Sequence, residues 1–217
     1  MSREQGGFGL LEVMLALAIG LMCLAAVSQV FVAAHQAWRL QGAAVHMQDD
    51  ARFALLHMAQ SIRMAGMFGC LRAQPGDFKA PEAIQAFAQP LQVGTSSLDL
   101  VVAELPGYTG IPNWTLRTDC IEQVQVHRAR EGNDQLPLAF PISRHSYRLE
   151  GTTLVFKRAN SRNFQPLVNH VRELRLVHVP ALGGGRVDIQ LALYEPTLGI
   201  EQRYALTVVV RNPVDES

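Results

Sequence analysis

The residues best placed to do chemistry lie near the start of the chain, where one carboxylate interrupts a long apolar run. Between Phe8 and Val27 the only charged side chain is Glu12. A carboxylate inside a membrane helix costs about 2.5–3.5 kcal/mol at the bilayer centre and less near an end, so it needs a partner. Cleavage between Gly7 and Phe8 would release an α-amine, which is positively charged near neutral pH. Glu12 could pair with that amine within one chain or between neighbouring chains.

The apolar run around Glu12 is long enough to cross a membrane as a helix. The residues from Phe8 to Val27 would span about 30 Å, the thickness of the hydrocarbon core of a bilayer. No proline occurs before Pro75, and the sequence beyond the run is amphipathic. The helix is therefore expected to continue to about Ala65, with Gly66 as a stop signal.

This pattern resembles the class III signal of type IV prepilins and type II secretion pseudopilins. A short polar leader ends in Gly7, Phe8 follows, and Glu12 becomes the fifth residue of the mature chain. The resemblance implies cleavage after Gly7 by prepilin peptidase, N-methylation of Phe8, and assembly into a helical filament. One departure is Gly9, where the family usually has Thr or Ser. The alternative is an ordinary signal anchor in which Glu12 is tolerated near the membrane edge.

A second stretch resembles the PilW family of type IV pilus minor pilins. Its features are an Arg52-Phe53-Ala54 helix and a following Arg63-x-Ala65-Gly66-x-x-Gly69-Cys70 motif. Together the two matches cover residues 1–70. The general similarity extends to the J-type pseudopilins of type II secretion, which are the second candidate.

These features predict four segments. Residues 1–7 would be the leader and 8–28 the transmembrane and filament-core helix. Residues 29–66 would continue the helix as an amphipathic segment, and 67–217 would form a β-rich globular domain outside the cytoplasm. Cys70 and Cys120 both lie in that domain, where thiols are oxidised, so one disulfide between them is expected. Two buried free thiols are the alternative.

Beyond the helix the sequence pattern changes to a period of two, which is typical of strands. A loop is expected over 71–97, with a short helix around 82–88, and another loop over 106–119. The predicted class is α+β, a mostly antiparallel sheet packed against the lower half of the long helix. Strands are predicted over 98–104, 121–128, 143–149, 152–158, 171–179, 187–194 and 204–211. A hairpin at Glu150-Gly151 joins two of them, and Gly183-Gly184-Gly185 is interpreted as another hairpin connection.

Composition and spacing argue against a nucleic-acid-binding protein, a metal site or an enzyme. Lys and Arg together number 19, as do Asp and Glu, so the net charge is zero. His35, His46 and His57 share one helical face but stand about 16 Å apart along the axis, too far to bind one ion. No Ser has an adjacent His and acid in an interpretable frame, although catalytic triads can assemble from distant positions. We expect no catalytic residues, no metal and no cofactor.

The sequence therefore favours a minor pilin that helps initiate or cap a type IV pilus. A type II secretion pseudopilin is the alternative, and a signal-anchored periplasmic enzyme or receptor is a remote one. The implied partners are prepilin peptidase, other minor pilins and the major pilin. The expected location is the inner membrane before assembly and then the filament, near its tip.

Overall fold

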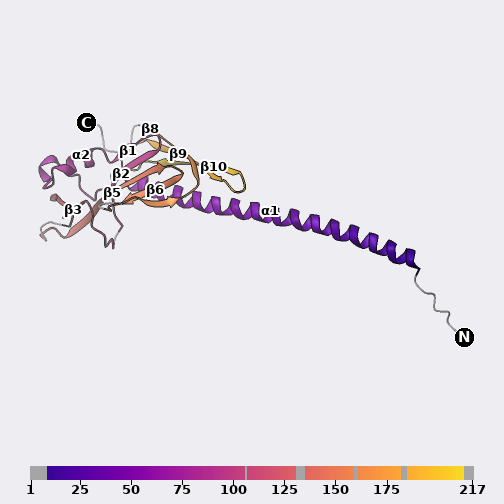
Figure 1. Cartoon of the computed structure of the whole chain (residues 1–217). Coiled ribbons are helices and arrows are strands. Elements are labelled where there is room, and N and C mark those ends of the chain that lie inside the picture. Colours follow the sequence, from indigo (N-terminus) through magenta and orange to yellow (C-terminus); the bar gives the residue numbers. More distant parts are fainter. Residues whose placement is uncertain (1–8, 106, 131–134, 159–160, 182–184, 213–217) are drawn as a thin grey trace. The chain divides into compact units, whose positions relative to one another are not determined.

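The structure is a computed structural model of the whole chain. It describes all residues except 1–8, 106, 131–134, 159–160, 182–184 and 213–217. The chain forms two compact units, Met1–His46 and Met47–Ser217. The helical elements are α1 (Leu10–Met64), the short 3-10 helix η1 (Pro75–Asp77) and α2 (Glu82–Ala88). The strands are β1 (Leu91–Val93), β2 (Ser97–Ala103), β3 (Trp114–Thr118), β4 (Val124–Arg128), β5 (Leu138–Glu150), β6 (Thr153–Arg158), β7 (Gln165–Val168), β8 (Val171–Val179), β9 (Arg186–Glu195) and β10 (Ile200–Val209) (Figure 1).

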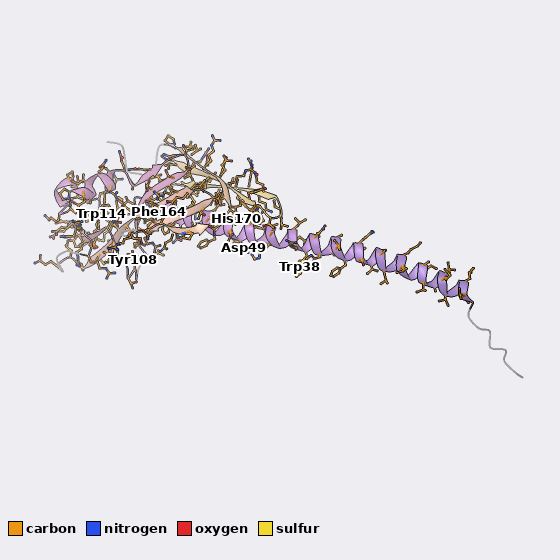
Figure 2. All side chains as sticks on the ribbon, viewed as in Figure 1. Trp38, Asp49, Tyr108, Trp114, Phe164 and His170 are labelled. Carbon is orange, nitrogen blue, oxygen red and sulfur yellow. A yellow bond between two sulfur atoms is a disulfide. The ribbon has the colours of Figure 1, made fainter. Side chains whose placement is uncertain are left out.

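The first unit consists of the N-terminal part of α1. Every described side chain from Leu10 to Gln41 is exposed in the isolated chain, and most of them are apolar. Figure 2 shows these side chains standing out from the helix, with Trp38 among them. α1 contains a segment that is long and apolar enough to cross a membrane, and none of that segment is buried within the chain. Lipid or neighbouring subunits would have to cover such a surface.

The second unit contains two antiparallel sheets. One has the strand order β1-β2-β5-β3-β4, with β6 paired to β5 and β7 paired to β6; the other has the order β10-β9-β8. The β5–β6 hairpin turns at Gly151, whose φ of 59° lies in the left-handed region that glycine tolerates.

The last turns of α1 form the centre of the main core. From Met47 onward, buried side chains on α1 recur at three- and four-residue spacing and contact both sheets. Alternate residues of β2 face two different cores, because side chains alternate along a strand. Leu98, Leu100 and Val102 belong to the α1 core, whereas Val101 and Ala103 belong to a second core that α2 covers.

The predicted α+β class is confirmed. The helix prediction agrees over the described residues, and the predicted helix at 82–88 and strand at 171–179 match α2 and β8. Residues 114–118 were expected to lie in a loop, and that prediction is wrong: β3 occupies them and pairs with both β4 and β5. Trp114, Leu116 and Thr118 are buried there, so tertiary pairing outweighs the turn-forming residues that precede them. Sequence reasoning also missed the short strands β1 and β7.

Backbone and side-chain hydrogen bonds cap the C-terminal end of α1. The Gly66 N–H donates to the Val101 carbonyl at 3.1 Å. The Asn212 side-chain amide donates to the Arg63 and Ala65 carbonyls, both at 3.2 Å. The two Asn212 contacts satisfy carbonyls that a helix end leaves without partners.

Gly66→Ala is expected to destabilise the second unit. Gly66 has a φ of 73°, and an added Cβ would lie 2.5 Å from the Asn212 carbonyl oxygen. Left-handed backbone at a non-glycine residue costs about 1–3 kcal/mol, and the steric clash adds to it. Gly151→Ala is the matched control, because its φ is 59° and no atom lies within 4 Å of its added Cβ. Chemical denaturation of the full chain in detergent should show a larger loss for Gly66→Ala, and equal losses would contradict the clash.

Candidate functional site

The predicted assembly carboxylate lies in the first turn of α1. Glu12 is exposed, and its N–H donates to the Gly9 carbonyl at 3.0 Å. A carboxylate in the first turn of a helix is stabilised by the positive end of the helix dipole. Glu12, Ala16 and Gly20 follow at four-residue steps, so they share one helical face. The predicted cleavage residues Gly7 and Phe8 lie outside the described residues.

The predicted disulfide between Cys70 and Cys120 is present. Cys70 follows the end of α1, and Cys120 lies in the turn between β3 and β4. The Asp119 carboxylate shapes this turn, since it accepts the N–H groups of residues 121, 122 and 123 at 2.9–3.0 Å. The same N–H groups, that of Ile121 foremost, hold the pKa of the Asp119 carboxyl below its ordinary value. The bridge therefore links the end of the long helix to a turn of the sheet that the Asp119 carboxylate stabilises.

Sequence reasoning missed a group of polar side chains between α1 and β5, which we call the polar chain (His57, Ser61, Glu104, His145 and Tyr147). His57 and Ser61 lie one turn apart on α1. His145 and Tyr147 are alternate residues of β5 and so point to the same face of the sheet. Glu104 follows β2, which pairs with β5 in antiparallel register.

The members of the polar chain are joined by four successive contacts. His57 Nδ1 lies 2.8 Å from the Tyr147 hydroxyl oxygen. That oxygen lies 2.7 Å from Ser61 Oγ, which lies 3.2 Å from His145 Nδ1. His145 Nε2 lies 3.2 Å from Glu104 Oε1. Ser61, His145 and Tyr147 are buried, and the Glu104 side chain is only 6% exposed.

Burial and neighbouring charges shift the pKa values of this group. Burial lowers the pKa of His57, and the positive charges of His145 and Arg158 lower it further. Burial opposes ionisation of Glu104, but His145 and Arg158 outweigh it and hold the pKa of that carboxyl below its ordinary value. Burial raises the pKa of the Tyr147 phenol well above its usual range, so this hydroxyl keeps its proton.

A pocket of about 280 Å³ borders the polar chain. Its wall includes Gln60 and Met64 of α1, Tyr108 from the loop after β2, and Arg158 at the end of β6. The Arg158 Nε lies 3.6 Å from Glu104 Oε1, and the guanidinium lies 5.8 Å from the centre of the Tyr108 ring. Figure 2 labels Tyr108 in this unit.

Ser61, His145 and Glu104 are connected in the order of a serine-hydrolase triad. Acyl transfer also needs N–H donors aimed at the substrate oxyanion. Ser61 lies inside α1, where backbone N–H groups already donate along the helix. The Ser61 hydroxyl is also bound to Tyr147. We therefore interpret the polar chain as a network that ties α1 to β5.

The structure separates the three helical histidines. His35 and His46 are exposed, whereas His57 is half-buried because the core covers α1 only from Met47 onward. No acid lies at ligand spacing from His145 in the sequence, and the fold places the distant Glu104 beside it. The residues joined across the chain are 41 to 90 positions apart, so no local pattern marks them. Within the described residues no group of three or more His, Cys, Asp or Glu side chains is arranged to hold a metal ion.

Comparison with known protein families gives a match at the N-terminus. Residues 2–28 match the family described as "Prokaryotic N-terminal methylation motif". No curated protein and no solved structure matches this chain significantly. The matched residues include the predicted cleavage junction, Glu12 and the start of the apolar helix. The methylation motif, the apolar helix and the antiparallel β domain together support a type IV pilin- or pseudopilin-like protein that is anchored in a membrane before it enters a filament.

Proposed function

We propose that this chain is a minor pilin, PilW-like in character, that helps initiate or cap a type IV pilus. The observation that carries the proposal is the methylation motif at residues 2–28, which coincides with an apolar helix left uncovered by the rest of the chain. A surface of that kind suits a subunit that moves from lipid into a filament core. The Arg52-Phe53-Ala54 and Gly69-Cys70 segments favour the minor-pilin assignment.

In this proposal each segment has its own task. Residues 1–7 are the leader that prepilin peptidase removes, and Phe8 becomes the N-methylated first residue. Residues 8–28 hold the subunit in the inner membrane and then pack in the filament core. Residues 29–66 extend the helix, and 67–217 form the globular domain outside the cytoplasm. That domain contacts other minor pilins and the major pilin near the filament tip.

The second candidate is a minor pseudopilin of type II secretion, J-like in character. The methylation motif supports both candidates equally. Recovery of the chain in pili sheared from the cell surface would favour the minor pilin. Retention in the cell envelope together with loss of protein secretion in a deletion strain would favour the pseudopilin. A signal-anchored periplasmic enzyme or receptor is the remote alternative, and an uncut N-terminus would favour it.

Processing at Gly7–Phe8 tests the proposal directly. We expect N-terminal mass spectrometry of the membrane-bound and filament-bound chain to find N-methyl-Phe8 as the first residue. Gly7→Val should block cleavage, because a branched side chain is placed directly at the cut. Gly6→Val is the matched control, since it adds the same side chain one residue earlier, and it should still be cut. A filament-associated chain that begins at Met1 or Ser2 would refute the proposal.

A further inference from the structure

The polar chain forms a continuous hydrogen-bonded path from His57, on the side of α1 that borders the pocket, to the buried carboxylate of Glu104. Apart from the contact with Glu104, the path has three hydrogen bonds, which we call links: His57 to Tyr147, Tyr147 to Ser61, and Ser61 to His145. Each link needs one hydrogen atom between its two heavy atoms. The Glu104 carboxylate accepts the Nε2–H of His145 whether that imidazole is neutral or protonated.

The number of hydrogens available to the three links depends on the two histidines. The Tyr147 and Ser61 hydroxyls supply one hydrogen each, so the links are filled when one imidazole Nδ1 carries a hydrogen. This condition is met when both imidazoles are neutral and also when either His57 or His145 alone is protonated. In the last two states the hydroxyl hydrogens point in opposite directions, but no heavy atom has to move.

Protonation of both histidines puts four hydrogens into three links. One hydroxyl hydrogen then has no acceptor within the polar chain. The Tyr147 hydroxyl also faces the His57 carbonyl oxygen, but the distance of 3.4 Å is long for a hydroxyl hydrogen bond. A buried donor without a partner destabilises the folded state. The two imidazolium charges also repel each other across the network.

We propose that the polar chain is a pH-sensitive contact between α1 and β5, which we call the latch. The latch binds one excess proton without losing a hydrogen bond, and it can bind a second proton only when one of its hydrogen bonds breaks. The latch loosens the packing of α1 on β5 in acid. This inference concerns the second unit alone and does not depend on the proposed pilus function.

The charged and titratable groups that face the two histidines come from every neighbouring element. Glu104 follows β2, Tyr147 belongs to β5, Arg158 ends β6, and Tyr108 lies in the loop after β2. Burial opposes a charge on His57, and the positive charges of His145 and Arg158 oppose it further. Protonation of His57 is therefore the event expected to break a hydrogen bond of the polar chain.

The sign of the pH dependence follows from the pKa of His57, which folding lowers. The unfolded chain binds this proton near the ordinary histidine pKa of about 6.5, and the folded chain binds it only at lower pH. The stabilising effect is thus fully present above about pH 6.5 and is lost as the pH falls from there towards the folded pKa of His57.

A nuclear magnetic resonance titration of the full chain in detergent, with ¹⁵N-labelled histidine, tests the latch in the unmodified protein. We expect the His57 imidazole to take up its proton only below the ordinary histidine pKa of about 6.5, because folding lowers its pKa. Tyr147→Phe keeps the ring that packs against His57 and Phe156 but removes two of the three links. In this variant the His57 imidazole should take up its proton at a higher pH than in the unmodified chain. Protonation of His57 at or above the ordinary histidine pKa in the unmodified chain, or at an unchanged pH in Tyr147→Phe, would overturn the proposal.

Thermal unfolding gives an independent test. Between about pH 7.5 and about pH 5.5 histidine changes its charge and most carboxyls stay ionised. We expect the unmodified chain to lose melting temperature over this interval and His57→Gln to lose less than half as much. His178→Gln is the matched control, because His178 is an exposed histidine on β8, and it should behave like the unmodified chain. Equal losses in all three proteins would overturn the latch.

Discussion

Glu12→Ala is expected to abolish incorporation of this chain into filaments while leaving cleavage and membrane insertion intact. Removal of the carboxylate makes the apolar run more apolar, so insertion should not suffer. In the filament core the α-amine of a neighbouring subunit would lose its counter-charge in a medium of low dielectric constant, where an unpaired charge is costly. Immunoblots of membrane and sheared-filament fractions measure the two outcomes separately.

Two controls separate the charge of Glu12 from its shape and position. Glu12→Gln keeps the side-chain length but removes the charge, so it should fail to assemble as Glu12→Ala does. Asp49→Ala removes an exposed carboxylate from the same helix, outside the apolar run, and should assemble normally. Normal incorporation of Glu12→Ala would refute the pairing between this carboxylate and the amine.

Loss of the Cys70–Cys120 disulfide is expected to destabilise the second unit strongly. The bridge closes a loop across a sequence separation of 50 residues. The chain-entropy estimate for a loop of that length is about 4 kcal/mol of unfolding free energy. The double variant Cys70→Ala/Cys120→Ala should show most of this loss in chemical denaturation of the full chain in detergent.

The third cysteine, Cys23, provides a control variant and an expected number of free thiols. Cys23 is an exposed free thiol in the apolar part of α1, and Cys23→Ala should leave stability unchanged. Titration of the unfolded, unreduced chain should detect the Cys23 thiol alone, and reduction should expose the other two. Detection of all three thiols without reduction would contradict the bridge.

The elements that form by local rules could be predicted from the sequence. The long helix follows from apolar composition and the absence of proline, and it ends where Gly66 adopts a positive φ. β8 follows from a largely alternating pattern of apolar and polar residues. The pattern around Gly7, Phe8 and Glu12 could be read without the fold, because these residues lie within one short segment of the sequence.

β3 shows what local rules could not decide. Its five residues follow a segment rich in turn-forming residues, and only pairing with β4 on one side and β5 on the other makes them a strand. Strand stability of this kind comes from cross-strand neighbours, which the local sequence does not contain.

The sequence by itself determined the N-terminal motif, the membrane-length helix, the α+β class and the pair of cysteines that form the bridge. Only the tertiary structure brought His57 and Ser61 of α1 together with His145 and Tyr147 of β5 and with Glu104. The physical reason is distance along the chain. Helix periodicity and strand alternation fix which face a side chain occupies, but the residue opposite it depends on how α1 packs on the sheet and on the register between β2 and β5.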